Sequence, residues 1–181
     1  MPTGVCGRRS KRRVADFDPV PILEVLHKHG VRFIVIGAVA AIAQGYPLPT
    51  EDLDVTPARD PENLGRVAAA LRELEAELRV TGGQSVPFPI DARFLAESDS
   101  WTLATRFGDL DLVSVPAGTR GFDDLARDAS DADVGGGLVV SIASLRDVIR
   151  MKEASNRVKD QAQLPALRQT LEVIRRRERK E

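Results

Sequence analysis

The chain has 181 residues, of which 43% are hydrophobic, and a formal net charge of −1. This length predicts one domain with a core of its own, and the balanced charge excludes a protein whose whole surface binds polyanions. The single cysteine, Cys6, excludes an internal disulfide framework and favours a reducing compartment, and no signal peptide is recognisable. The apolar runs are too short to span a bilayer, so we expect a cytoplasmic protein without membrane contact.

Positive charge is concentrated at the two ends of the chain. Five cations lie within 8–13, and five more lie within 175–180. Such clusters are typical of solvated termini but also suit contact with nucleic-acid phosphates, and both interpretations stay open. Residues 1–15 contain glycine, serine and cations and little that could pack. They predict a basic disordered leader, followed by a single domain over 16–181.

Apolar periodicity, capping residues and breakers predict the elements of the first half of the chain. Asp18-Pro19 begins a helix that Gly30 ends, and Asp60-Pro61 caps a longer amphipathic helix. Between them, a β-branched and aromatic run predicts a buried strand, and an alternating run predicts a second strand. In chain order we expect a helix at 18–29, a strand at 31–36, a short helix at 39–44, a strand at 52–56 and a helix at 60–78.

Strands are more frequent in the second half. We expect strands at 86–94, 101–105 and 109–115, a helix at 121–127, a hairpin at 131–140, a helix from 144 to 156, and a last helix from 158 that is bent or restarted near Pro165. Early alternation of helices and strands, followed by clustered strands, predicts an α/β (α+β) fold. It would contain a mixed β-sheet with helices packed on it and a helical C-terminus.

The first candidate site combines the turn at Gly37-Ala38 with Asp52 and Asp54. Because strand residues i and i+2 face the same way, the two aspartates point to one side. Neighbouring carboxylates repel each other unless a cation neutralises them, and Mg²⁺ prefers such hard oxygen ligands. The glycine turn before a helix exposes backbone N–H groups, which suit a phosphate. A strand with its polar face in water is the alternative interpretation.

The second candidate segment repeats this pattern at Asp109 and Asp111. If its strand lies beside the first, a third carboxylate joins the cluster, and two-metal phosphoryl transfer needs such a cluster. A third carboxylate can also take the proton from an attacking hydroxyl. An exposed strand face is again the alternative.

The third candidate segment lies near the end, at Lys152, Arg157, Lys159 and Asp160. Asn156 interrupts the helix here and lets the following residues turn back towards the sheet. Cations beside carboxylates would bind a triphosphate and stabilise charge that develops at the α-phosphorus. A solvated helix surface with mixed charges is the alternative.

In this order, the three segments resemble the nucleotidyltransferase superfamily typified by DNA polymerase β, and in particular its small prokaryotic branch. That branch has a strand, a Gly-Gly or Gly-Ser turn, a helix and a DxD or DxE strand. Here the corresponding residues are 35–38 and 52–54, with Thr50 two residues before the first aspartate. The segment KEASNRVKDQAQL, 152–164, is similar to the tail element of AbiE-type and MenAT-type toxins. The resemblance covers about 20–170.

The resemblance implies a Mg²⁺-dependent enzyme that transfers a nucleotide from an NTP and releases pyrophosphate. It implies metal ligands at Asp52, Asp54 and Asp111, further catalytic residues at Lys152 and Asp160, and NTP-binding residues at Gly37, Ala38, Thr50, Arg157 and Lys159. In the toxin group the acceptor is tRNA, modified at its 3′ end. A separately encoded antitoxin protein holds the enzyme in check.

Two positions depart from the pattern. Ala38 replaces the second glycine or serine of the turn, so the backbone N–H remains but a hydroxyl is lost. Gln163 replaces the final acidic residue of the tail element, so no carboxylate acts there.

Two alternatives remain beside an RNA-directed toxin. One is a transferase that acts on a small molecule or a protein hydroxyl. The other is a catalytically silent member that serves as a binding partner, and retention of all three aspartates argues against it.

Overall fold

The computed structural model describes residues 17–179, so the leader predicted at 1–15 lies outside the described residues. Within the described part, eight strands form one mixed sheet in the order β4-β3-β5-β6-β2-β1-β8-β7. The strands are β1 (Phe33–Ile36), β2 (Asp52–Pro57), β3 (Glu77–Val80), β4 (Gln84–Val86), β5 (Ser100–Thr105), β6 (Gly108–Val113), β7 (Ser130–Asp133) and β8 (Val139–Ile142).

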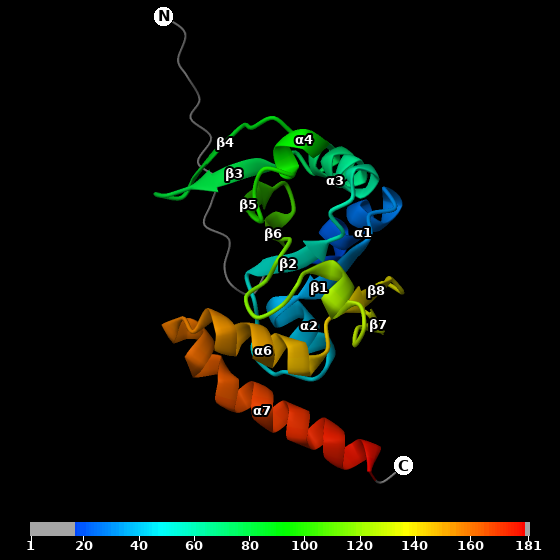
Figure 1. Cartoon of the computed structure of the whole chain (residues 1–181), viewed down its shortest axis with the longest axis vertical. Coiled ribbons are helices and arrows are strands. Elements are labelled where there is room, and N and C mark those ends of the chain that lie inside the picture. Colours follow the sequence, from blue (N-terminus) through cyan, green and yellow to red (C-terminus); the bar gives the residue numbers. More distant parts are fainter. Residues whose placement is uncertain (1–16, 180–181) are drawn as a thin grey trace, which may run out of the picture.

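Helices pack on both faces of this sheet. They are α1 (Val20–Lys28), α2 (Gly37–Ala43), α3 (Pro61–Glu73), α4 (Ala92–Leu95), α5 (Phe122–Leu125), α6 (Leu145–Ser155) and α7 (Val158–Glu178). Figure 1 shows α2 and α6 on one side of the central strands, α1 and α3 on the other, and α7 against α6. The predicted mixed sheet with packed helices and a helical C-terminus is therefore confirmed. Between residues 17 and 179, no helix combines the length and apolar character needed to cross a bilayer.

The alternating sequence of β2 divides its side chains between the two faces of the sheet. Leu53 and Val55 are buried in the hydrophobic core, where a fully buried side chain of this size contributes about 2 kcal/mol. Asp52 and Asp54 lie on the opposite face, towards α2 and α6. Because β2 pairs with β1 on one side and with β6 on the other, it places both aspartates in the middle of the sheet.

The helix predicted to reach residue 78 ends earlier, and this prediction was wrong at its C-terminal end. α3 stops at Glu73, and Glu75 adopts a left-handed backbone with φ of 53°. The amides of Glu75 and Ala76 bond back to the carbonyls of Arg72 and Leu71, which is a Schellman ending. The chain then enters β3, whose Leu78 packs against the core, so apolar spacing alone did not reveal the change of element.

The strand predicted at 86–94 was also wrong. β4 ends at Val86, and Pro87 and Pro89 follow, neither of which can donate to a strand ladder. Asp91 then caps the short helix α4, because its carboxylate accepts a hydrogen bond from the Phe94 amide.

The last two helices follow the predicted break. Ser144 caps α6 by accepting a hydrogen bond from the Asp147 amide, and Asn156 ends the helix in a left-handed conformation with φ of 50°. α7 begins two residues later and continues as one helix through Pro165. Of the predicted bend or restart near Pro165, the restart therefore does not occur. This break turns the start of α7 towards β2.

Candidate active site

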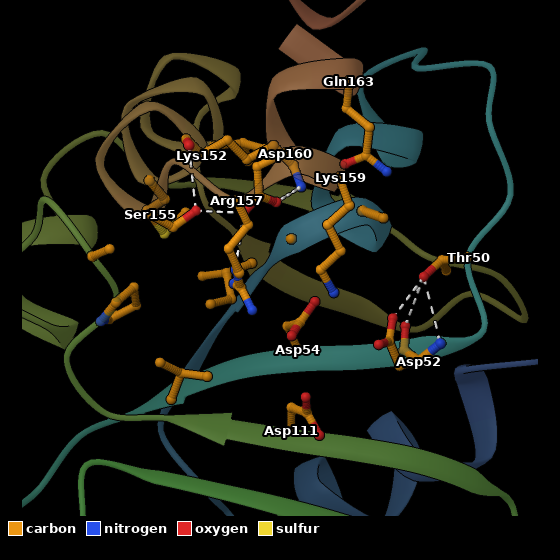
Figure 2. A pocket seen from close by; sticks show the side chains of 18 of the residues that line it. Thr50, Asp52, Asp54, Asp111, Lys152, Ser155, Arg157, Lys159, Asp160 and Gln163 are labelled. Carbon is orange, nitrogen blue, oxygen red and sulfur yellow. Dashed lines mark hydrogen bonds and ion pairs between the residues drawn. The ribbon is translucent and has the colours of Figure 1, made fainter.

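Parallel pairing of β2 with β6 brings the predicted aspartates together. Asp54 lies opposite Asp111, and Asp52 lies opposite Asp109. Directly opposite residues share a face, so all four carboxylates lie on the side of the sheet covered by α2 and α6. Figure 2 shows Asp54 and Asp111 next to each other, with Asp52 further along β2. The strand adjacency on which the third carboxylate depended is confirmed.

The turn from β1 into α2 begins against this cluster. Antiparallel pairing places Ile36 opposite Asp54, and Gly37 follows with φ of 65°. A Cβ at Gly37 would lie 2.1 Å from Oδ2 of Asp54, which is far inside van der Waals contact. Glycine is therefore required here both by the backbone conformation and by the close approach of the carboxylate.

The carboxylate of Asp54 is held where its charge is unfavourable. Its pKa is raised from 3.8 to about 7, first by burial and then by the negative charges of Asp52 and Asp111. The cations Lys152 and Lys159 lower this pKa, but less strongly. Among the described residues, none donates a hydrogen bond or forms an ion pair with Asp54. This carboxylate therefore lacks a counter-ion of its own.

Thr50 fixes the neighbouring aspartate. Its hydroxyl lies 2.9 Å from Oδ1 of Asp52 and 3.1 Å from the Asp52 carbonyl oxygen. Thr50 therefore contacts a carboxylate of the cluster, and its assignment to the nucleotide stays a prediction.

The tail element is organised by a buried carboxylate. Asp160 has only 4% of its side chain exposed, and its oxygens lie 3.1 Å from Nζ of Lys152 and 3.0 Å from Nε of Arg157. The Ser155 hydroxyl also donates to it. Burial raises the pKa of Asp160, but the hydrogen bonds from Ser155 and Lys152 and the charges of Lys152 and Arg157 outweigh it and lower the pKa. Asp160 therefore holds Lys152 in place.

A pocket of about 350 Å³ joins the aspartate cluster to the tail element. All ten residues predicted for the site line this pocket: Gly37, Ala38, Thr50, Asp52, Asp54, Asp111, Lys152, Arg157, Lys159 and Asp160. Figure 2 shows Lys159 descending from α7 towards Asp54. Gln163 also lines the pocket, so the departure from the family pattern lies within the site.

The structure adds residues that the sequence interpretation missed. Ser100 and Thr102 line the pocket from β5, and Ser155 binds Asp160. The sequence contained a signal for each of them: the alternating side chains of β5 for Ser100 and Thr102, and the position inside the tail element for Ser155. Arg79 forms ion pairs with Asp109 and Asp111 from β3, a strand that the sequence did not predict.

The donor set fits a divalent cation that arrives with a nucleotide. In the part of the chain that the structure describes, no group of three acidic, histidine or cysteine residues is arranged to hold a metal ion alone. Mg²⁺ commonly takes one or two carboxylates and completes its shell with substrate phosphates and water. Asp52 and Asp54 could supply these carboxylates, and the partly buried Asp54, which has no ion-pair partner among the described residues, has the chemistry that such an ion would neutralise.

Known structures share this architecture. TM1012 of Thermotoga maritima, a protein assigned as a nucleotidyltransferase, superposes with a TM-score of 0.54 and 15% identity over 81% of this chain and 87% of its own. The lincosamide antibiotic adenylyltransferase LnuA, in its lincomycin-bound form, gives a TM-score of 0.54 and 14% identity over 82% of this chain and 93% of its own. No protein-family model and no curated protein matches the sequence. The chain has a nucleotidyltransferase fold.

Proposed function

We propose that this protein is a nucleotidyltransferase that moves a nucleoside monophosphate from an NTP to an acceptor hydroxyl. The observation that carries the proposal is the convergence of Asp52, Asp54 and Asp111 with Lys152 and Lys159 on one pocket, in a nucleotidyltransferase fold. Carboxylates on one wall and cations on the other match a triphosphate and its metal ion.

In the proposed reaction, the acceptor oxygen attacks the α-phosphorus in line with the bond to the β-phosphate, which breaks to release pyrophosphate. Asp52 and Asp54 would hold a divalent cation, which would neutralise phosphate charge when bound. Lys159 and Arg157 bind the triphosphate, and Lys152, fixed by Asp160, offsets the negative charge of the leaving pyrophosphate.

Asp111 receives the proton of the acceptor hydroxyl in this proposal. Burial raises the pKa of Asp111, although the charge of Arg79 opposes this rise. A raised pKa suits a carboxylate that accepts a proton.

For the acceptor, we propose the 3′ end of an RNA, specifically tRNA, with the protein acting as a toxin paired with an antitoxin protein. Similarity of the tail element to AbiE-type and MenAT-type toxins supports this acceptor, as does the basic end of α7. The competing acceptor is a small molecule, and the fold shared with a lincosamide adenylyltransferase favours it.

One experiment tests both the transferase activity and the identity of the acceptor. Labelled NTPs and Mg²⁺ are offered to the protein together with tRNA, other RNAs, and a panel of hydroxylated antibiotics and proteins. We expect label in tRNA and none with an Asp54→Asn variant. Label in an antibiotic alone would replace the RNA acceptor with a small molecule, and absence of any label would reject transferase activity. Expression without an antitoxin should arrest growth of a bacterial host, and normal growth would reject the toxin role.

A further inference from the structure

Arg79 reaches the aspartate cluster from two strands away. β5 lies between β3 and β6, with Glu77 of β3 opposite Ala104 and Ala104 also opposite Asp109. Because residues i and i+2 share a face, Arg79 lies on the same face as Asp109 and Asp111. On this face, the intervening strand β5 carries the small residues Ala104 and Thr102, which lie opposite Asp109 and Asp111.

The guanidinium of Arg79 bridges two carboxylates at the end of this path. Its Nη1 pairs with Asp109, and its Nη2 lies 3.2 Å from Oδ1 of Asp111. Nε of Arg79 is buried and has no hydrogen-bond partner among the described residues. The polar contacts of the guanidinium are therefore directed at the two aspartates, in the planar, forked geometry that arginine offers and lysine does not.

We propose that Arg79 is a positioning residue that serves as the resident counter-ion of Asp109 and Asp111, and that it weakens divalent metal binding until a nucleotide enters. The inference rests on the proposed metal-dependent function. It accounts for the absence, among the described residues, of three acidic side chains arranged around a common point. One oxygen of Asp111 is occupied by Arg79, and the arginine charge repels an incoming cation.

The pairing of Asp109 and Asp111 with Arg79 affects whether the metal ion or the nucleotide binds first. In the free protein, Asp52 and Asp54 alone offer carboxylates without an arginine partner, which is a weak set for Mg²⁺. An NTP brings phosphate oxygens that complete the coordination shell. The metal ion is therefore expected to bind as a complex with the nucleotide.

The inference is tested by measuring Mn²⁺ binding to the nucleotide-free protein, which requires no transfer activity. Calorimetry or the electron paramagnetic resonance of free Mn²⁺ measures this binding. The main variant is Arg79→Met, which keeps the aliphatic length across β5 but removes the charge. We expect Mn²⁺ to bind the variant about tenfold more tightly than the original protein. Arg59→Met is the matched control, because Arg59 pairs with Asp99 and does not line the pocket. Its Mn²⁺ affinity should stay unchanged.

A second variant links the effect to the named carboxylate. In Arg79→Met combined with Asp111→Asn, the gain in Mn²⁺ affinity should disappear. Equal affinities for the original protein and Arg79→Met, a gain that persists without Asp111, or no detectable binding to either protein would each overturn the inference. Because nucleotide transfer is not measured, loss of the proposed enzymatic function and loss of this inference give different results.

Discussion

The charge on Asp54 makes the stability of the protein depend on pH. Its pKa is about 7 in the folded protein, against 3.8 for an ordinary aspartate, and burial is the main cause. The folded state therefore binds more protons than the unfolded state between these values. Stability from this group is fully present below pH 3.8 and is lost as pH rises towards 7, at up to about 1.4 kcal/mol per pH unit.

Substitution Asp54→Asn should remove this loss. Without divalent metal, the variant should match the original protein near pH 4, become more stable than it as pH rises to about 7, and keep a constant advantage above that. Urea unfolding across the pH range measures the difference, with the exposed Asp128→Asn as a control that should show none. Parallel pH profiles for Asp54→Asn and the original protein would contradict the burial of a charged carboxylate.

Alanine substitutions at Gly37 and Gly45 distinguish the cost of backbone strain from the cost of a clash with the site. Both have positive φ, but a Cβ at Gly37 meets Asp54 whereas a Cβ at Gly45 meets nothing within 4 Å. Gly45→Ala should cost about 1–2 kcal/mol of unfolding free energy from strain alone. Gly37→Ala should cost more and should abolish nucleotide transfer. Equal unfolding costs, with transfer retained in both variants, would show that the turn does not depend on its close approach to Asp54.

At the scale of elements, the junction between α6 and α7 assigns different roles to the cations of the tail. Lys152 has 16% of its side chain exposed and is paired with the buried Asp160. Lys159 is exposed, and no described residue forms an ion pair with it. The first cation therefore belongs to the structure of the junction as well as to the pocket, whereas the second is available for a ligand.

Asp160→Asn should therefore act mainly on stability, whereas Lys159→Ala should act mainly on NTP binding. Removing the carboxylate leaves Lys152 without its partner in a poorly solvated place and should cost about 3 kcal/mol of unfolding free energy. Removing the exposed lysine should change stability by less than about 0.5 kcal/mol but raise KM for the NTP. Urea unfolding and steady-state kinetics on both variants measure the contrast. A stable Asp160→Asn protein with normal kinetics would remove Asp160 from the organisation of the site.

The sequence predicted local features of this architecture better than long-range ones. The helix start near residue 144, the break at Asn156 and the alternation in β2 depend on neighbouring residues, and each was confirmed. The end of α3 was not predictable from the same rules, because Glu75 takes the left-handed position that glycine usually marks. With β3 unrecognised, the ion pairs between Arg79 and β6 could not be foreseen, since they depend on which strands become neighbours.

At the scale of the whole molecule, α7 separates the pocket from a basic surface. Lys159 lies in its first turn and Arg175, Arg176 and Arg177 in its last turns. At 1.5 Å per residue, about 24 Å of helix lies between Lys159 and Arg175. Figure 1 shows the two ends of α7 well apart, with the C-terminal end away from the sheet. A small acceptor held at the pocket cannot touch both places, whereas an RNA can.

Replacing Arg175, Arg176 and Arg177 together with glutamine therefore distinguishes the two proposed acceptors. Glutamine keeps helix propensity, and the arginine pairs with Glu172, at 3.8 and 3.9 Å, are exposed and weak, so folding should be unaffected. RNA affinity should fall, and the slope of log affinity against log salt should become shallower by about 0.7 for each single-strand phosphate that the variant no longer neutralises. NTP binding should not change, because the pocket is distant. Unchanged RNA affinity and salt slope would mean that α7 ends in a solvated surface and that the acceptor is held near the pocket alone, as a small molecule would be.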